Sequence, residues 1–364
     1  MAVRFLHAAD FHMDSPFEAL SAEKAALRRG EQRELLERLA DLANRENVQA
    51  VLLAGDLLDS AVSYYETRTV LQNVLGRIRA RVFLAPGNHD YWTPDCPYAA
   101  MDLPENVTVF HPGPIRAVEV PELGFRVWGT AFQAPAASDL LQGFRAPKSD
   151  LVELMVLHGD VGGQSRYSPV TEEDIAASGL DYLALGHVHT ASGLQKSGET
   201  YWAYPGCPEG RGFDETGTKG VYLGTAEKGN VTLDFVPMAG REYRVQEIVL
   251  APETDPLAAA KAACAEGSAR DVRRLIFKGE HRGPVAVAEI AQALEDAAFH
   301  LELRDETREP EDLWAGAGND SLRGITLASL RTAWSQASDE AERQKVTLAV
   351  RYALAALDHR EEIR

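Results

Sequence analysis

The part of the chain with the most obvious chemistry is the pentapeptide Pro-Gly-Asn-His-Asp at residues 86–90. It follows the apolar run 81–85, which predicts a buried β-strand that the Pro-Gly pair ends. An amide, an imidazole and a carboxylate are thereby brought together at one strand end. These groups suit a metal ligand, a proton donor and an orienting residue in an α/β enzyme, because the sites of such enzymes lie beyond the carboxyl ends of their strands.

Four other predicted strand ends carry side chains of the same kind. Strands over residues 3–9, 51–54, 154–157 and 182–185 each run directly into carboxylates or imidazoles. Together, the five strand ends carry Asp10, His12, Asp56, Asn88, His89, His158, His187 and His189. Oxygen and imidazole ligands without thiolate suit Mn, Fe, Zn or Mg ions better than they suit a structural zinc site.

Eight such groups exceed the needs of one metal ion. Two ions about 3.5–4 Å apart and bridged by one carboxylate account for the number, and Asp56 is the natural bridge. Each piece alone has a plainer interpretation, since an Asp-x-His is commonly a turn and a single buried histidine is commonly part of the core. The Gly-His-Val-His sequence at 186–189 is more telling, because two imidazoles at one strand end have little structural purpose. The occurrence of five such motifs in one chain favours a metal site.

The elements that must hold these groups alternate between strands and helices. Apolar residues recur at helical spacing over residues 21–47 and 66–79, which lie between the first three strands. Further strands are predicted at about 125–129, 200–203, 221–223 and 231–235. We expect the last three to form the closing edge of a sheet. The strand–helix–strand order predicts an α/β sandwich.

The sequence changes character near residue 240. Three predicted strands, with a helix between residues 285 and 298, indicate a small α+β unit. Two helical stretches follow at about 326–336 and 339–359. We therefore predict a site-bearing domain over 1–240, an α+β domain over 241–310 and a C-terminal helical segment over 311–364.

Bulk composition limits the class of protein. The 364 residues are 45% hydrophobic and 25% charged, as in an ordinary globular protein, and the net charge is −18. This charge argues against a simple DNA-coating protein but not against a metal-dependent enzyme acting on phosphates. The apolar opening is too short for a signal peptide, no run reaches bilayer length, and the three cysteines form no CxxC pair. We therefore expect a cytoplasmic protein that makes no membrane contact.

In order and spacing, the motifs resemble the full set of the calcineurin-like metallophosphoesterases over about residues 1–240. They are Asp10-x-His12, Gly55-Asp56-x-x-Asp59, Gly87-Asn88-His89-Asp90, His158 and Gly186-His187-x-His189. Within that superfamily, residues 6–12 and the loop 204–211 are similar to the nuclease subunits of SbcCD-type complexes, which are DNA repair exonucleases. The resemblance implies a four-layer α-β-β-α sandwich, with residues 241–310 as its small α+β capping domain.

The resemblance also implies how the ligands divide between two ions. One ion would be held by Asp10, His12, Asp56 and His189, and the other by Asp56, Asn88, His158 and His187. Asp59 would orient a ligand imidazole, and manganese is the metal expected from the nuclease relatives. The ions would activate a water molecule for in-line attack on phosphorus and neutralise charge on the phosphoryl oxygens.

Further residues receive roles in the same reaction. His89, next to a ligand but not one itself, would protonate the leaving 3′ or 5′ oxygen, with Asp90 orienting it. Arg211 follows the last strand end and is a candidate for a phosphate contact, although a plain surface arginine fits the sequence equally well. A basic cluster in the second unit is either a DNA contact or a solvated strand edge, with the second interpretation slightly favoured. The cluster comprises Arg273, Arg274, Lys278, His281 and Arg282.

The leading hypothesis is a two-metal phosphodiesterase acting on DNA as an exo- or endonuclease, together with an SbcC-like coiled-coil ATPase. The apolar face of the last helix either docks that ATPase or packs on the capping domain, and residues 64–79 are candidates for a homodimer contact. A stand-alone phosphodiesterase or phosphatase on nucleotides or phosphoproteins is the second hypothesis, which the acidic charge favours. A catalytically idle, partner-binding scaffold is the third, and the intact set of ligands argues against it.

Overall fold

The computed structural model describes residues 2–60, 62–162, 165–310 and 312–359. The chain forms two compact units. The first comprises residues 1–246, 260–276 and 288–304, and the second comprises 247–259, 277–287 and 305–364. The domain boundaries at 240 and 310 stay a prediction, and residue 311, where the predicted third segment begins, lies outside the described residues.

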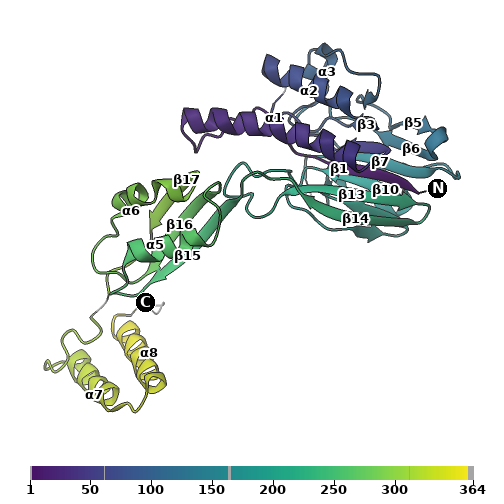
Figure 1. The fold of residues 1–364 in the computed structure, drawn as a ribbon. Helices are drawn as coiled ribbons and strands as arrows, with labels where there is room; N and C mark the ends of the chain where they lie inside the picture. The colour runs from purple at the N-terminus through teal and green to yellow at the C-terminus, as the bar shows by residue number, and fades with distance from the viewer. Residues whose placement is uncertain (1, 61, 163–164, 311, 360–364) are drawn as a thin grey trace. The chain divides into compact units, whose positions relative to one another are not determined.

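Two six-stranded sheets form the framework of the first unit (Figure 1). The first sheet has the order β14-β13-β1-β2-β3-β4, in which β1 to β4 are parallel and β13 and β14 are antiparallel additions next to β1. Its strands are β1 (Val3–Ala8), β2 (Ala50–Leu53), β3 (Arg81–Leu84), β4 (Val107–Val109), β13 (Gly220–Glu227) and β14 (Asn230–Pro237).

The second sheet has the order β11-β12-β10-β7-β6-β5, with four parallel strands between two antiparallel edges. Its strands are β5 (Arg116–Val120), β6 (Phe125–Gly129), β7 (Val152–His158), β10 (Tyr182–Gly186), β11 (Gln195–Ser197) and β12 (Thr200–Ala203). A short ladder pairs β8 (Asp160–Val161) with β9 (Pro169–Val170). Parallel strands end at the same edge of their sheet, so each sheet presents one edge of carboxyl ends.

The two sheets pack face to face over a shared core. Their inward-facing side chains form one buried cluster that includes Phe5, Leu52, Phe83, Phe125, Leu154 and Tyr182. The outer face of the first sheet packs on α1 (Ala22–Arg45) and α2 (Tyr65–Arg77), and that of the second packs on α4 (Glu172–Ala177). Alternate residues of each strand supply the two faces. The predicted α-β-β-α sandwich is confirmed.

Helix α1 illustrates how the local sequence selects this packing. The Ser21 side chain caps the helix by accepting a hydrogen bond from the Lys24 N–H at 3.3 Å. Leu35, Leu36 and Leu39 recur at helical spacing and are buried against the first sheet. Burial of each leucine side chain contributes about 2 kcal/mol, which fixes this face of the helix on the sheet.

A buried polar pair also joins the two sheets. Nδ1 of His7 in β1 lies 2.8 Å from the Tyr182 hydroxyl in β10, and its Nε2 lies 3.1 Å from the Leu185 main-chain oxygen. Burial lowers the pKa of His7 to about 3, so the ring is neutral near pH 7. A neutral imidazole therefore bridges β1 and β10 shortly before each strand reaches its carboxyl end.

The remaining chain contains a three-stranded sheet of order β15-β16-β17 and further helices. The strands are β15 (Tyr243–Leu250), β16 (Val272–Gly279) and β17 (His300–Asp305), and the intervening helices are α5 (Pro256–Ala265), α6 (Val287–Ala293) and the 3₁₀ helix η2 (Glu295–Ala297). In the second unit, α7 (Leu322–Gln336) and α8 (Glu340–Leu357) pack through Leu327, Val350 and Leu354. The apolar face of the last helix is therefore partly used within the chain.

The predicted elements of the sandwich are present with ends shifted by a few residues. Two predictions about the later chain are wrong or incomplete. The strands predicted at 221–223 and 231–235 join the first sheet beside β1, whereas the strand at 200–203 lies in the second sheet, so they do not form one closing edge. Helix α5 occupies a stretch for which the sequence analysis predicts no element. No helix in the described ranges is long and apolar enough to cross a membrane.

Candidate metal centre

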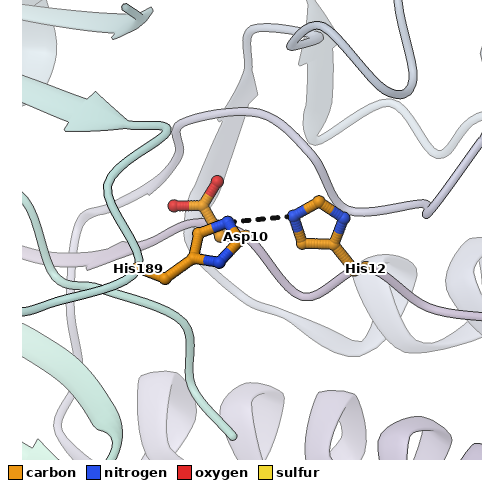
Figure 2. A group of neighbouring side chains, drawn as sticks. All are labelled: Asp10, His12 and His189. Carbon is orange, nitrogen blue, oxygen red and sulfur yellow. Dashed lines mark hydrogen bonds between the residues drawn. The ribbon is translucent and has the colours of Figure 1, made fainter. Parts of the chain in front are cut away.

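Side chains from five parallel strands gather at the carboxyl edges of the two sheets. Figure 2 shows three of them, Asp10 and His12 following β1 and His189 following β10, pointing toward one another. β2 leads into Asp56, and β7 ends at His158. The structure brings together all the ligands predicted from the sequence, which are Asp10, His12, Asp56, Asn88, His158, His187 and His189.

The backbone at these strand ends is strained. The φ angles are 56° at Asp10, 44° at His12, 51° at Asp56 and 108° at His187, whereas non-glycine residues rarely adopt positive φ. Hydrogen bonds hold the strain in place: the Asp10 N–H donates to the Gly55 oxygen at 3.0 Å, and the His12 N–H donates to the Asp56 oxygen at 2.9 Å. Each such residue costs about 1–3 kcal/mol, and strain of this kind concentrates at functional sites.

Two glycines allow the strand ends to approach closely. A Cβ at Gly87 would lie 2.3 Å from Asp56 Oδ1, and a Cβ at Gly186 would lie 1.9 Å from the Ala54 main-chain oxygen. Neither distance leaves room for a side chain, so only glycine permits the observed packing. The two glycines thus set the spacing between the loops that carry the candidate ligands.

A first group of donors surrounds His12. Its Nε2 lies 3.2 Å from His189 Nε2 and 3.7 Å from Asp56 Oδ2. One donor atom each from Asp10, His12 and His189 lie within 4.8 Å of one another. The Asp10 carboxylate also accepts the His187 main-chain N–H, with both oxygens at 3.1 Å from the nitrogen.

A second group of donors surrounds His158. Its Nε2 lies 2.9 Å from Asn88 Oδ1 and 3.4 Å from Asp56 Oδ2. His187 Nδ1 lies 3.3 Å from the same Asn88 oxygen. Because Asp56 Oδ2 is close to both His12 and His158, this carboxylate lies between the two groups.

The hydrogen-bond partners of two candidate ligand histidines determine which ring nitrogen of each carries the proton, and this arrangement is compatible with metal binding. The Nδ1 of His189 faces Glu215 Oε1 at 2.6 Å, and the Nδ1 of His158 faces the Ala54 oxygen at 2.9 Å. Because a carboxylate and a carbonyl only accept, each Nδ1 must carry the proton, which leaves a lone pair on each neutral Nε2. These lone pairs face His12 Nε2 and Asp56 Oδ2. The Asp56 oxygen can only accept, and His12 Nε2 is also an acceptor when the His12 proton lies on Nδ1, which faces Asp59 Oδ1. A divalent cation in each group relieves this crowding of acceptors, so the donor set fits a metal.

Burial governs the charges of the site. It lowers the pKa of His12 and of His187 to about 4, so both rings are neutral near pH 7 and available as ligands. Burial and the neighbouring Asp56 carboxylate raise the pKa of Asp10 well above its usual range. Burial also acts to raise the pKa of Asp56, but His158 and the nearby imidazoles outweigh it and hold that pKa below its usual value. Buried carboxylates this close together are stabilised by a cation between them.

His89 lies at the exposed rim of the site. Its Nδ1 lies 2.9 Å from the Asp59 main-chain oxygen, and its main-chain N–H donates to Asp56 Oδ1 at 2.9 Å. The ring stands edge-on to His12, with 4.7 Å between ring centroids. Among the described residues, Nε2 has no hydrogen-bond partner, so it is the ring atom that can face a substrate.

Asp90 does not make the contact that the sequence analysis predicts. Its buried carboxylate accepts hydrogen bonds from the three main-chain N–H groups of residues 56–58 and from the Tyr98 hydroxyl. The partner of the His89 ring is the Asp59 carbonyl instead. Asp90 therefore holds the loop that carries Asp56, and its predicted role in orienting His89 is corrected accordingly.

A chain of charged residues lies outside the donors. Arg211 donates to Asp59 Oδ1 at 3.0 Å and to Glu215 Oε1 at 2.8 Å. Asp59 Oδ1 lies 3.2 Å from His12 Nδ1, and Glu215 Oε1 accepts from His189 Nδ1. Arg211 thus links the carboxylate partners of two imidazoles, and its phosphate contact stays a prediction.

Glu215 is a residue of the candidate site that the sequence analysis missed. Burial acts to raise its pKa, but the hydrogen bond from His189 and the charge of Arg211 hold that pKa far below its usual value, so the carboxylate is ionised. It lies in a loop after the last motif, where neither a repeat nor a recognisable spacing marks it. The only signal is its position four residues after Arg211.

Most members of the predicted basic cluster have partners within the chain. Arg274, Lys278 and Arg282 are each paired with a glutamate, respectively Glu302, Glu247 and Glu253. Arg273 is buried and donates to the Ala263 main-chain oxygen at 3.0 Å. These pairs favour the solvated, structural interpretation of the cluster.

Comparisons with known proteins agree with the geometry. Residues 3–191 match the family described as calcineurin-like phosphoesterase. The uncharacterized metallophosphoesterase YhaO of Bacillus subtilis is 33% identical over 248 residues, which are 64% of this chain and 59% of the relative.

Two further relatives have names that refer to nucleases or DNA repair. A subunit of the nuclease SbcCD from Rhodobacter capsulatus is 31% identical over 143 residues, which are 38% of this chain and 29% of that protein. The DNA double-strand break repair protein Mre11 of Saccharolobus solfataricus is 26% identical over 264 residues, which are 68% of this chain and 66% of that protein. The chain thus spans 59% and 29% of the lengths of YhaO and the Rhodobacter protein.

Proposed function

The chain belongs to the calcineurin-like phosphoesterase family, and from that premise we propose that it hydrolyses phosphodiester bonds in DNA. Metal-dependent phosphoester hydrolysis follows from the family itself, whose members bind divalent metal ions. The finer assignment to DNA draws support from the relatives whose names refer to the nuclease SbcCD and to Mre11. The observation that carries the proposal is the position of Asp56 between two groups of imidazole and oxygen donors.

The proposed ligands divide as the geometry suggests. Asp10, His12, Asp56 and His189 would hold one ion, and Asp56, Asn88, His158 and His187 would hold the other. When bound, such ions lower the pKa of a water molecule and neutralise charge on phosphoryl oxygens, and manganese is the metal we propose. Glu215, which accepts from His189 Nδ1, would keep that imidazole in the orientation and tautomer that ligation requires, and the Asp59 carboxylate, 3.2 Å from His12 Nδ1, would do the same for His12.

His89 is the proposed general acid. With Nδ1 donating to the Asp59 carbonyl, the protonated ring presents its second N–H at Nε2 toward a substrate, where the leaving oxygen needs a proton. The Asp56 carboxylate, which accepts the His89 main-chain N–H, ties the position of this ring to that of the ligands. His89 is exposed and its ring centroid lies 4.7 Å from that of the candidate ligand His12, so the proposed acid stands next to the proposed ligands.

The location, the protein partner and the oligomeric state are also proposals. We propose a cytoplasmic protein that acts on DNA ends with an SbcC-like coiled-coil ATPase, and that forms a homodimer through the helix near the site. All three cysteines are free, as expected in a reducing compartment. The exposed Tyr64 and Tyr65 at the start of α2 support the dimer contact.

A stand-alone phosphodiesterase or phosphatase is the second candidate. It is favoured by the net charge of −18 and by the carboxylate partners of Arg274, Lys278 and Arg282, which leave less basic surface for a DNA backbone. Nucleotides or phosphoproteins would then be the substrates.

The deciding experiment measures manganese-dependent hydrolysis by wild type, His89→Ala and Asp56→Ala. Linear duplex DNA, single-stranded DNA and bis-p-nitrophenyl phosphate serve as parallel substrates. If wild type degrades DNA and both variants do not, the result supports the proposed nuclease activity. Turnover of the small diester with both DNA substrates intact favours the second candidate. If none of the substrates is hydrolysed in a metal-dependent manner, the proposal that the protein is an enzyme is overturned, and a partner-binding scaffold is favoured.

A further inference from the structure

A cavity of about 420 Å³ borders the loop that carries the candidate ligand His189. Its wall begins at Thr190, the residue after the candidate ligand His189, and continues onto β13 and β14. The groups that line it are chemically varied: an ammonium, a carboxylate, hydroxyls and aromatic rings. They include Lys219, Asp214, Thr190, Thr216, Thr218 and Phe235. The volume lies in the range of sites for small organic ligands.

Lys219 is the unusual member of this wall. The residue is only 7% exposed, and its Nζ donates to the His189 main-chain oxygen at 3.0 Å. No carboxylate of the described residues lies within 4.0 Å of its ammonium group. The other buried cations of the first unit differ, because Arg28 pairs with Glu31 and Glu209, and Arg273 lies 3.6 Å from Asp271. The half-buried Arg211 also pairs with two carboxylates.

A buried ammonium without an anionic partner is energetically costly, because its lost hydration is not replaced. One carbonyl uses one of its three N–H donors, which leaves two donors at the wall of the cavity. An anionic oxygen in the cavity would supply the missing partner. The hydroxyls of Thr190 and Thr216 on the same wall are suitable additional donors to a phosphate.

The rest of the wall narrows the class of ligand. A bare inorganic anion would leave the Asp214 carboxylate facing a like charge, whereas a ligand with its own N–H or O–H donors would satisfy it. Phe235 is partly exposed and stands edge-on to Tyr222, with ring centroids 5.7 Å apart. An exposed ring beside a cation and hydroxyls is a typical surface for stacking a nucleobase above a bound phosphate.

We propose that this cavity is a subsite for one nucleotide unit of the substrate strand, next to the phosphate that is cleaved. Lys219 holds the phosphate of that unit, Asp214 accepts from the base or sugar, and Phe235 packs against the base. The subsite rests on the proposed action on DNA, and it gives the enzyme contact with a nucleotide beyond the reacting phosphate.

The test measures binding of thymidine 5′-monophosphate to the full-length, metal-free protein by titration calorimetry. Without metal, the nucleotide phosphate has no metal ions to bind at the candidate metal centre, and the Arg211 guanidinium there is already paired with Asp59 and Glu215, so binding reports mainly on the cavity. Wild type is expected to bind, Lys219→Met to bind roughly tenfold more weakly because a charge-assisted hydrogen bond is lost, and Lys219→Arg to retain most of the affinity. Lys196→Met, which removes an exposed lysine paired with Glu199, is the matched control and is expected to bind as wild type does.

Since Lys219 also contacts the His189 carbonyl, a second variant separates binding from folding. Thr216→Val removes a lining hydroxyl that makes no hydrogen bond to another described residue, and it is expected to weaken binding about threefold. Failure of wild type to bind the nucleotide, or equal affinities for wild type, Lys219→Met and Thr216→Val, overturns the subsite.

Hydrolysis supplies an independent arm. Lys219→Met should lose roughly tenfold more kcat/KM on a single-stranded oligonucleotide than on bis-p-nitrophenyl phosphate, which carries no neighbouring nucleotide. Equal losses on both substrates overturn the subsite and assign Lys219 a positioning role at His189. If wild type binds the nucleotide but cleaves no DNA, the proposed function fails, and the cavity stands only as a nucleotide-binding site and not as a subsite for a DNA strand. If wild type cleaves DNA but binds no nucleotide, the subsite alone fails.

Discussion

Gly87→Ala is the substitution with the most specific expected effect on the metal centre. The new Cβ would lie 2.3 Å from Asp56 Oδ1 and 2.9 Å from the Asp56 main-chain nitrogen. The Asp56 side chain is short, buried and anchored by its hydrogen bond from the His89 N–H, so it cannot swing aside without leaving its position between His12 and His158. The variant therefore acts on the candidate bridging carboxylate without changing it chemically.

The size of the effect follows from the distances. An ordinary contact requires about 3.3 Å, so the carboxylate or the loop must move by roughly 1 Å, and such overpacking costs about 1–3 kcal/mol of stability. Metal–ligand distances tolerate only about 0.2 Å, and a misplacement of about 1 Å costs on the order of 100-fold in rate. We expect about 100-fold weaker manganese binding and a similar loss of kcat/KM.

The assay is calorimetric titration of metal-stripped protein with Mn²⁺, with thermal unfolding measured in parallel. Gly30→Ala in α1 is the control, because its Cβ would have no neighbour within 4 Å and should stabilise the helix by about 0.5–1 kcal/mol. Circular dichroism must show that both variants are folded. Wild-type manganese affinity in a folded Gly87→Ala protein would refute the bridging position of Asp56.

Three further predictions concern residues around the site. Glu215→Gln should weaken manganese binding about 10- to 100-fold with little change in fold, because the variant lacks the carboxylate charge that fixes the tautomer of His189. Unchanged manganese affinity in the same titration would contradict this role of Glu215. Asp90→Asn should lower the free energy of unfolding by about 3 kcal/mol, because an amide group cannot accept hydrogen bonds from all the loop N–H groups. A variant that proves as stable as wild type in urea unfolding would contradict this prediction. His7 has a folded pKa of about 3, below its unfolded value of 6.5, so its contribution to stability is complete above pH 6.5 and is lost as the pH falls. Between pH 7.5 and 5.5 the metal-free wild type should therefore lose about 1.4 kcal/mol more than His7→Gln in urea unfolding, and parallel pH profiles would disprove the assignment.

The strand ends and the position of the candidate ligands at them could be predicted from the sequence because both signals are local. A short apolar run marks a buried parallel strand, and polar residues directly after it must lie at the sheet edge. The helix 21–47 was equally accessible, because its apolar residues keep a helical spacing that survives as the buried face of α1. For these strands and helices, the residues within and directly after the element are enough to predict it.

The errors concern partners that lie far away along the chain. Asp90 is adjacent to His89 in sequence, yet its carboxylate faces the N–H groups of residues 56–58, and only the fold brings that loop to it. Glu215 reaches His189 from a loop without periodicity. The strand at 221–223 pairs with β1 rather than with its neighbour in sequence, and no local pattern distinguishes the two sheets. The positive φ angles at Asp10 and Asp56 are likewise imposed by tertiary hydrogen bonds rather than by residue type.

The pairing of β1 with β13 also has a consequence for how the protein is made. Val3 lies opposite Ala226, so β1 leaves the ribosome long before β13, the strand that pairs with it. At about 5–20 residues per second, synthesis of the intervening residues takes roughly 10–40 s, during which one edge of β1 has no partner. An unpaired hydrophobic strand edge is a site for mispairing with other chains. Nascent chains that stop before residue 220 should therefore aggregate and depend on chaperones. Chains that extend past β13 should stay in solution, because β1 then has its partner strand.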